Sequence, residues 1–230
     1  AGSDVTVCIG EAVILSGANA SSYAWNNSVT NATTFSPTST LTYRVFGTDI
    51  NGCTNTDSLQ VTVNDLPIVN AGNDTSICDG ESISLNASGA LTYNWDNNIT
   101  NANTFTPISN TLYTVTGTDN NGCINTDQVN ITVNSLPNVD AGADVSICNG
   151  DSVTLNGGGA FTYDWDNNIT NATAFSPTVS KTYTLTGTDA NGCISTDNIL
   201  VTVNTLPNVD AGLDLAICIG SSVTLNGTGA

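Results

Sequence analysis

Seven cysteines are the side chains of this sequence that can form covalent bonds. They lack the Cys-x-x-Cys spacing of zinc sites, so disulfides made in an oxidising, extracellular compartment are the favoured interpretation. One set closes a short β-branched segment and the other follows an Asn-Gly turn. The first set is Cys8, Cys78, Cys148 and Cys218, and the second is Cys53, Cys123 and Cys193.

The cysteines recur because a seventy-residue unit is written three times and begun a fourth, with Ala-Gly opening each copy. A period of this size predicts one small module per repeat. We expect domains at 1–70, 71–140 and 141–210, and the first two strands of a fourth at 211–230. Two strands are not stable alone, which favours a segment of a longer polymer.

Two sets of disulfides are compatible with this spacing. Bridges within repeats join Cys8 to Cys53 and its equivalents. Bridges between repeats join Cys8 to Cys123 and Cys78 to Cys193, and leave the others to pair outside this sequence; the others are Cys53, Cys148 and Cys218.

Strand geometry favours the bridges between repeats. In a sandwich the first strand ends where the chain leaves the module, whereas the Asn-Gly hairpin lies at the opposite end. A strand of six or seven residues separates the two sulfurs by roughly 20 Å, and a disulfide needs Cα atoms within about 7 Å. If modules stack end to end, Cys8 comes near the hairpin of the next repeat.

Carboxylates are the second group that could do chemistry. Asp164 and Asp166 flank Trp165 and share one face of a strand, like a general acid and base, but repeat one has Ala24 and Asn26 there. No His is present to act as a base. An enzyme is therefore not expected.

Recurring acidic residues at the start of each repeat and in the hairpins could bind Ca²⁺, which prefers oxygen ligands. The alternative is that each Asp caps a turn through its own backbone. Calcium is thus the one cofactor considered beside none, with candidate ligands Asp74, Asp144, Asp119 and Asp189.

Charge narrows the partners. Two Lys or Arg against 20 Asp or Glu give a net charge of -18. Such a chain repels phosphate backbones and anionic lipid heads, so we expect no nucleic acid and no direct membrane insertion. Further repeats of the same polymer, surface polysaccharide and neighbouring filaments remain.

The elements that position these residues are strands. Residues 141–210 alternate at period two and are rich in Thr, Val, Asn and Gly, which predicts an all-β module. Expected strands include 145–148, 152–156, 161–165 and 181–188. Seven short strands describe an immunoglobulin-like sandwich.

Two aromatic positions fit the core of such a sandwich. A Trp recurs in the third strand and a Tyr near the start of the sixth. They are Trp25, Trp95 and Trp165, and Tyr43, Tyr113 and Tyr183. Gly47, Gly117 and Gly187 interrupt the strand of the Tyr, which indicates a bulge or a close backbone approach. Leu-Pro at 66–67, 136–137 and 206–207 predicts a stiff linker.

Longer motifs carry a family likeness. The chain contains Ala-Gly-x-Asp-x-x-Ile-Cys-x-Gly, Ser-Val-Thr-Leu, Tyr-x-Trp, Thr-Tyr-Thr-Leu-Thr-Gly-Thr-Asp-Ala-Asn-Gly-Cys and Val-Thr-Val-Asn. Together they resemble the Ig-like and PKD-like repeats of very large Bacteroidota surface proteins, which include gliding-motility adhesins. The resemblance implies type IX secretion and filaments on the cell surface. Asp166-Asn167-Asn168 departs from the Asp-Phe-Gly-Asp segment of typical PKD modules.

We therefore expect PKD-like sandwich repeats stacked end to end as a rod. The expected function is a filament or adhesin stalk at the cell surface, giving reach, stiffness and multivalent contact in adhesion or gliding. The alternative is a polysaccharide-binding module of a secreted enzyme.

Overall fold

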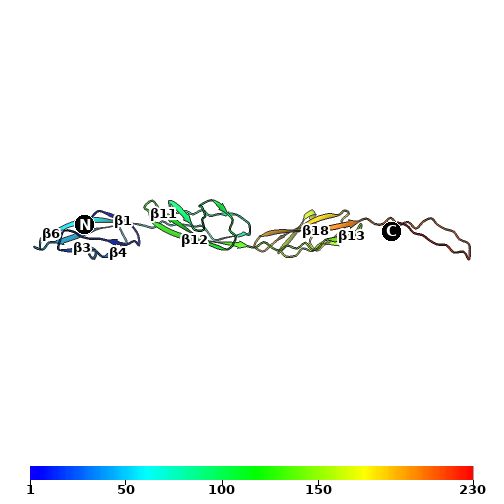
Figure 1. Ribbon diagram of the computed structural model, residues 1–230, viewed down its shortest axis with the longest axis horizontal. Coiled ribbons are helices and arrows are strands. Elements are labelled where there is room, and N and C mark those ends of the chain that lie inside the picture. The colour runs from blue at the N-terminus through cyan, green and yellow to red at the C-terminus, as the bar shows by residue number, and fades with distance from the viewer. Residues whose placement is uncertain (230) are drawn as a thin grey trace. The chain divides into compact units, whose positions relative to one another are not determined.

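The protein is all-β in the computed structural model, which describes residues 1–229. Each repeat contains six strands (Figure 1). Repeat one has β1 (Val5–Cys8), β2 (Val13–Ile14), β3 (Ser22–Trp25), β4 (Thr34–Phe35), β5 (Leu41–Thr48) and β6 (Thr54–Asn64). Repeat two has β7 (Thr75–Cys78), β8 (Ile83–Ser84), β9 (Thr92–Trp95), β10 (Thr104–Phe105), β11 (Thr111–Thr118) and β12 (Ile124–Asn134). Repeat three has β13 (Val145–Cys148), β14 (Val153–Thr154), β15 (Thr162–Trp165), a 3-10 turn (Asp166–Asn168), β16 (Ala174–Phe175), β17 (Lys181–Thr188) and β18 (Ile194–Asn204).

The strands of each repeat form two sheets, as an immunoglobulin-like sandwich requires. In repeat one the larger sheet has the order β1-β6-β5-β3, and β2 pairs with β4 in the smaller one. The first strand lies parallel to the last, with Cys8 opposite Asn64. The same arrangement recurs in repeats two and three. The predicted fold class is confirmed.

The number of strands differs from the prediction, because each repeat has six and not seven. The segment between the third and fourth strands makes turns instead. Asn167, Asn168 and Ala172 have φ near +58° there, a left-handed conformation that no extended strand allows.

Alternation at period two builds each core. On β5, Tyr43 and Val45 are buried whereas their neighbours along the strand are exposed. The three Trp and three Tyr expected in the core are all buried, at 2–8% exposure. Each Tyr also contacts a Phe of the smaller sheet, with ring centroids 5.3–5.4 Å apart.

The glycine of β11 marks a close approach and not a bulge, since Gly117 keeps regular pairing with Asn125 and Tyr93. A Cβ on Gly117 would lie 2.5 Å from Val69 Cγ2. Gly187 has the same relation to Val139. These positions need Gly because the residue just before each repeat packs onto the strand.

The chain divides into two compact units. The first spans Ala1–Val133, and the second begins at Asn134 and holds repeat three. Among the described residues no helix is long and apolar enough to cross a membrane.

The fourth repeat differs from the expectation of two strands. Residues 211–229 form no strand, and one antiparallel bridge joins Asp210 to Thr228. In complete repeats the first strand pairs with the last, and the second with the fourth. The sequence supplies neither partner here, which explains the missing strands. Residue 230, also assigned to this repeat, lies outside the described residues.

Candidate functional site

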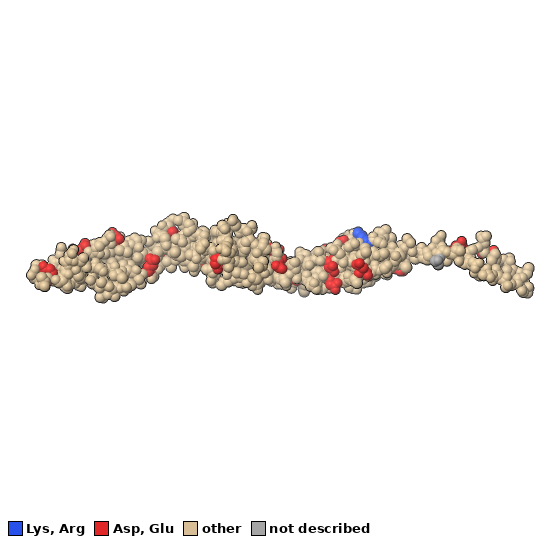
Figure 2. Space-filling view, in the orientation of Figure 1, with Lys and Arg blue, Asp and Glu red and all other residues tan. Residues whose placement is uncertain are grey.

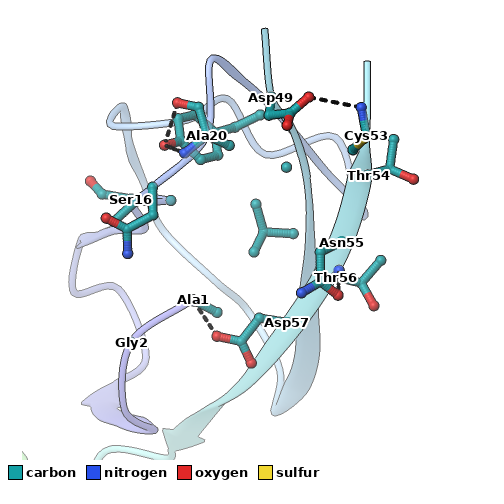
Figure 3. Close-up of a pocket in the computed structure, with 16 residues that line it drawn as sticks. Ala1, Gly2, Ser16, Ala20, Asp49, Cys53, Thr54, Asn55, Thr56 and Asp57 are labelled. Carbon is teal, nitrogen blue, oxygen red and sulfur yellow. Dashed lines mark hydrogen bonds and ion pairs between the residues drawn. The ribbon is translucent and has the colours of Figure 1, made fainter. Parts of the chain in front are cut away.

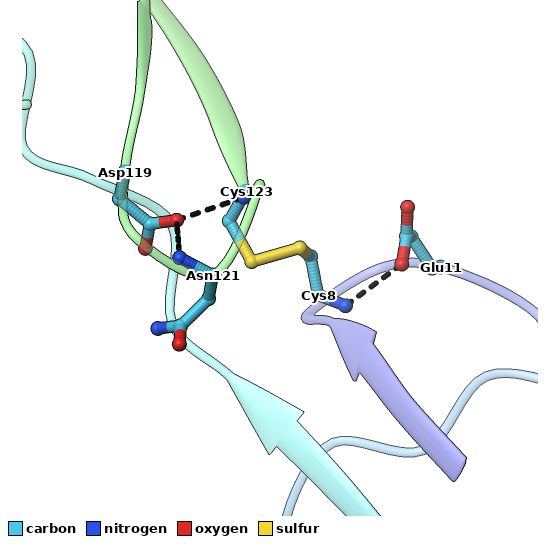
Figure 4. Close-up of a disulfide and its surroundings, with 5 residues drawn as sticks. All are labelled: Cys8, Glu11, Asp119, Asn121 and Cys123. Carbon is cyan, nitrogen blue, oxygen red and sulfur yellow. Dashed lines mark hydrogen bonds between the residues drawn. A yellow bond between two sulfur atoms is a disulfide. The ribbon is translucent and has the colours of Figure 1, made fainter. Parts of the chain in front are cut away.

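A disulfide between Cys8 and Cys123 joins repeat one to repeat two (Figure 4). The two residues are 115 positions apart, and their Cα atoms are 5.6 Å apart. This is the pair that the strand argument favours over Cys8 with Cys53. Both residues belong to the unit Ala1–Val133, so the bond is a covalent joint between two consecutive modules of that unit.

Cys8 reaches the joint because it is the last residue of β1, where the parallel pairing with β6 also ends. The chain then turns, and the N–H of Cys8 donates to Glu11 Oε2 at 2.7 Å. The same contact recurs at Cys78 with Glu81, at 2.8 Å. The cysteine is therefore held at the end of the module from which the chain leaves.

Cys123 is positioned by the hairpin between β11 and β12. Asp119 Oδ1 accepts the N–H groups of Asn121 and Cys123, both at 2.8 Å, and Gly122 supplies the turn with φ of +83°. Cys123 is fully buried, whereas Cys53, at the same hairpin position of repeat one, is exposed and free. Burial of this position thus accompanies its bond to the neighbouring repeat.

The remaining cysteines fall into two groups. Cys148 and Cys218 are exposed and free, like Cys53. Cys78 and Cys193 are both in disulfide form. Cys193 is fully buried, like Cys123. The second hairpin cysteine therefore has the same environment as the first.

The linker between repeats one and two is seated on repeat two. Val69 is buried in its core, and Asn70 forms a two-way backbone bridge with Ser88, with N–H to oxygen distances of 2.9 and 3.0 Å. Asn125 Nδ2 donates to the Pro67 carbonyl at 3.0 Å. The Leu-Pro linker is thus fixed at its C-terminal end by packing and by hydrogen bonds.

Carboxylates clasp the start of each repeat to its last strand. In repeat two, Asp127 Oδ2 accepts the N–H of Ala71 at 2.8 Å. This bond, and a second from the N–H of Gln128, hold the pKa of Asp127 below 3.8. In repeat three the N–H of Ala141 and then that of Asn198 lower the pKa of Asp197 in the same way. These acids complement backbone N–H groups.

The calcium candidates are placed separately. Asp74 Oδ1 accepts the N–H of Asn130 at 2.7 Å, and Asp144 Oδ1 that of Leu200 at 2.9 Å. Asp119 and Asp189 cap their hairpins. Within residues 1–229 no three His, Cys, Asp or Glu side chains lie close enough together to hold a metal. Calcium binding stays a prediction.

The carboxylates beside Trp165 also differ in role. Asp166 Oδ1 accepts the N–H of Thr184 at 3.2 Å, and so continues the strand pairing through a side chain. Burial and then the charge of Asp166 raise the pKa of Tyr183. The corresponding contact in repeat one is made by the amide of Asn26, at 2.8 Å. An uncharged residue thus does the same work, as expected for a structural contact.

One recurring polar residue escaped the sequence argument. Asn101 Oδ1 accepts the indole N–H of Trp95 at 3.0 Å and the N–H of Ala87 at 2.8 Å. Asn31 and Asn171 do the same in their repeats. The signal was available, because the Asn recurs six residues after each Trp. It satisfies the polar atom of the core Trp.

Charge does not gather into one site on the visible surface. In Figure 2 the carboxylates are scattered over the face shown. They occur on every repeat, together with only two basic side chains in the whole sequence. This distribution suits solvation more than the binding of one charged ligand.

Comparison with known proteins gives neither a family nor a curated relative: no family model and no curated protein matches the chain. Solved structures match in fold. The titin I-band fragment I67-I69 has a TM-score of 0.41 and 12% identity, over 88% of this chain and 96% of that chain. Immunoglobulin domains 1-4 of Sidekick-1 have 0.32 and 14%, over 88% and 74%. The N-terminal eight Ig domains of Down Syndrome Cell Adhesion Molecule have 0.29 and 16%, over 97% and 43%. All three are tandem Ig-like proteins, the arrangement that the sheets define here.

Proposed function

We propose that this chain is a structural segment of a long extracellular filament or adhesin stalk, which gives reach, stiffness and multivalent contact. The observation that carries the proposal is the Cys8–Cys123 bond between consecutive repeats. A joint closed by a disulfide cannot separate under load without bond cleavage. In the chain-entropy model, closing a loop of this length contributes about 5 kcal/mol.

The repeat period extends this joint along the polymer. Cys78 and Cys193 have the spacing of Cys8 and Cys123, and we propose that they bond to each other. By the same register, the exposed thiols of Cys53, Cys148 and Cys218 would pair with cysteines of further repeats. Every joint would then carry one disulfide.

The proposed location is outside the cell, because such disulfides persist in oxidising compartments. Attachment to a cell surface, type IX secretion and a role in adhesion or gliding motility are proposed from the likeness of the motifs. Partners would be further repeats, and neighbouring filaments or surface polysaccharide for the array.

The alternative, a polysaccharide-binding module, would call for an exposed aromatic that recurs. Phe161 is 75% exposed, but repeats one and two have Ser21 and Leu91 at its position. The recurring Trp and Tyr lie in the cores. The stalk is therefore the better-supported function.

Small-angle X-ray scattering of the oxidised chain tests the stalk. With the eleven residues of β12 at about 3.3 Å each, a repeat extends some 35–40 Å along its strands. We expect a rod-like profile with a maximum dimension above about 105 Å. Freely jointed globules would contradict the stalk. Glycan-array binding by the same sample would favour the polysaccharide module.

A further inference from the structure

A cavity of about 680 Å³ opens in repeat one, beside residues 16–20 and the hairpin end of β5 and β6 (Figure 3). Gly47, Cys53 and Asn55 contribute to its wall. It lies within a single repeat, at the end that carries the hairpin cysteine.

The same position in repeat two is filled by the linker. Val69 packs so closely that a Cβ on Gly117 would lie 2.5 Å from its Cγ2, and Asn70 bridges to Ser88. Repeat three shows the arrangement again. Val139 covers Gly187 at the same 2.5 Å, and Asp140 bridges to Gly158. A Val-Asx segment therefore occupies this seat in two repeats of the chain.

Repeat one carries the matching groups. A Cβ on Gly47 would meet Ala20 Cβ at 3.0 Å and no residue of a linker. Asn55 stands where Asn125 binds the Pro67 carbonyl, and its Oδ1 accepts the N–H of Thr56 at 2.8 Å, as Asn125 Oδ1 does with Thr126 at 2.9 Å. The amide is thus fixed in the same way in both repeats.

We propose that the cavity of repeat one is a docking site for an extended Leu-Pro-x-Val-Asx linker of a second copy of this repeat. The Val fills the space over Gly47, the Asx pairs with the backbone of Ala18, and Asn55 Nδ2 donates to the Pro carbonyl. This concerns one end of one module, so it goes beyond the proposed function and does not depend on the array being a stalk.

One substitution tunes the site. A Cβ on Gly89 would lie 1.7 Å from the Ile68 carbonyl oxygen, and repeat one has Asn19 at this position, with φ of +69°. The docked linker must therefore lie further from the module at the residue before its Val. Asn19 weakens the contact without closing the apolar space over Gly47.

The test is a titration of the full-length chain with the peptide acetyl-Leu-Pro-Asn-Val-Asp-amide, the sequence of 206–210, followed by amide chemical shifts in NMR. We expect saturable shifts at Ala18, Ala20 and Gly47. Asn19→Gly should tighten binding at least about tenfold, because the repeat-two seat is restored. Gly47→Ala should weaken it by a similar factor, since its Cβ enters the Val space.

A peptide with Val replaced by Asp is the control that needs no protein variant, and it should produce no saturable shifts. Absence of binding to the unmodified chain would overturn the proposal, even if Asn19→Gly binds. Equal binding of the Val and Asp peptides would overturn it too. Neither result bears on the scattering profile, so the stalk is tested separately.

Discussion

A single glycine in each repeat measures how tightly the linker is seated. Gly117→Ala places a Cβ 2.5 Å from Val69 Cγ2 and 2.8 Å from Ala90 Cβ. We expect a loss of about 1–3 kcal/mol by overpacking, seen as faster hydrogen exchange in β11. Gly47→Ala is the matched variant, because it meets Ala20 alone, and it should cost less. Equal losses in the two variants would show that Val69 is not the obstacle.

The clasp by Asp127 predicts a pH dependence. Its pKa is lowered by the N–H of Ala71 and then that of Gln128. A lowered pKa in the folded state means that the carboxylate stabilises the fold above its unfolded pKa of 3.8, and that this stability is lost as pH falls through the folded pKa. Carboxyl ¹³C shifts should titrate below 3.8 in the folded chain and near 3.8 in urea. A folded pKa at or above 3.8 would refute the clasp.

At the scale of elements, the disulfide fixes a strand end to a hairpin. The double substitution Cys8→Ser and Cys123→Ser should lower the urea midpoint of repeats one and two, by up to about 5 kcal/mol in the chain-entropy model. Trp25 and Trp95 fluorescence reports it. The matched control replaces Cys53 and Cys148, which are exposed and free, with Ser and should leave the midpoint unchanged. An unchanged midpoint in the first variant would contradict the stabilising role.

Strands with strong alternation were predictable from the sequence. The predictions 145–148 and 181–188 match β13 and β17, because each is a β-branched run that ends in a turn. The prediction 152–156 was too long, since β14 covers only Val153–Thr154. Its ends face no partner strand, and pairing is not visible in one strand's pattern.

The site was predictable where it followed from topology. The parallel first strand places Cys8 at the far end of its module from Cys53, and that argument needs only strand direction. The seat of Val69 was not predictable, because it depends on a contact between segments nearly fifty residues apart, Val69 with Gly117. The Gly itself indicated a close approach, but not which residue approaches.

At the scale of the whole molecule, the disulfide limits how far the chain can be pulled. Residues 9–122 lie inside the loop closed by Cys8 and Cys123. At about 3.3–3.6 Å per residue they hold roughly 400 Å of contour. Force spectroscopy with handles at both ends should show at least this much less extension for the oxidised chain than for the reduced one. Equal contour lengths would mean that the loop is not closed.

The central claim is that the covalent bonds cross between repeats, and disulfide mapping tests it most directly. After alkylation of free thiols, cleavage before each Asp puts every cysteine on its own peptide, because Asp residues separate all seven. Mass spectrometry without reduction should find Cys8 linked to Cys123 and Cys78 linked to Cys193, with Cys53, Cys148 and Cys218 alkylated. A peptide that links Cys8 to Cys53 would contradict the account.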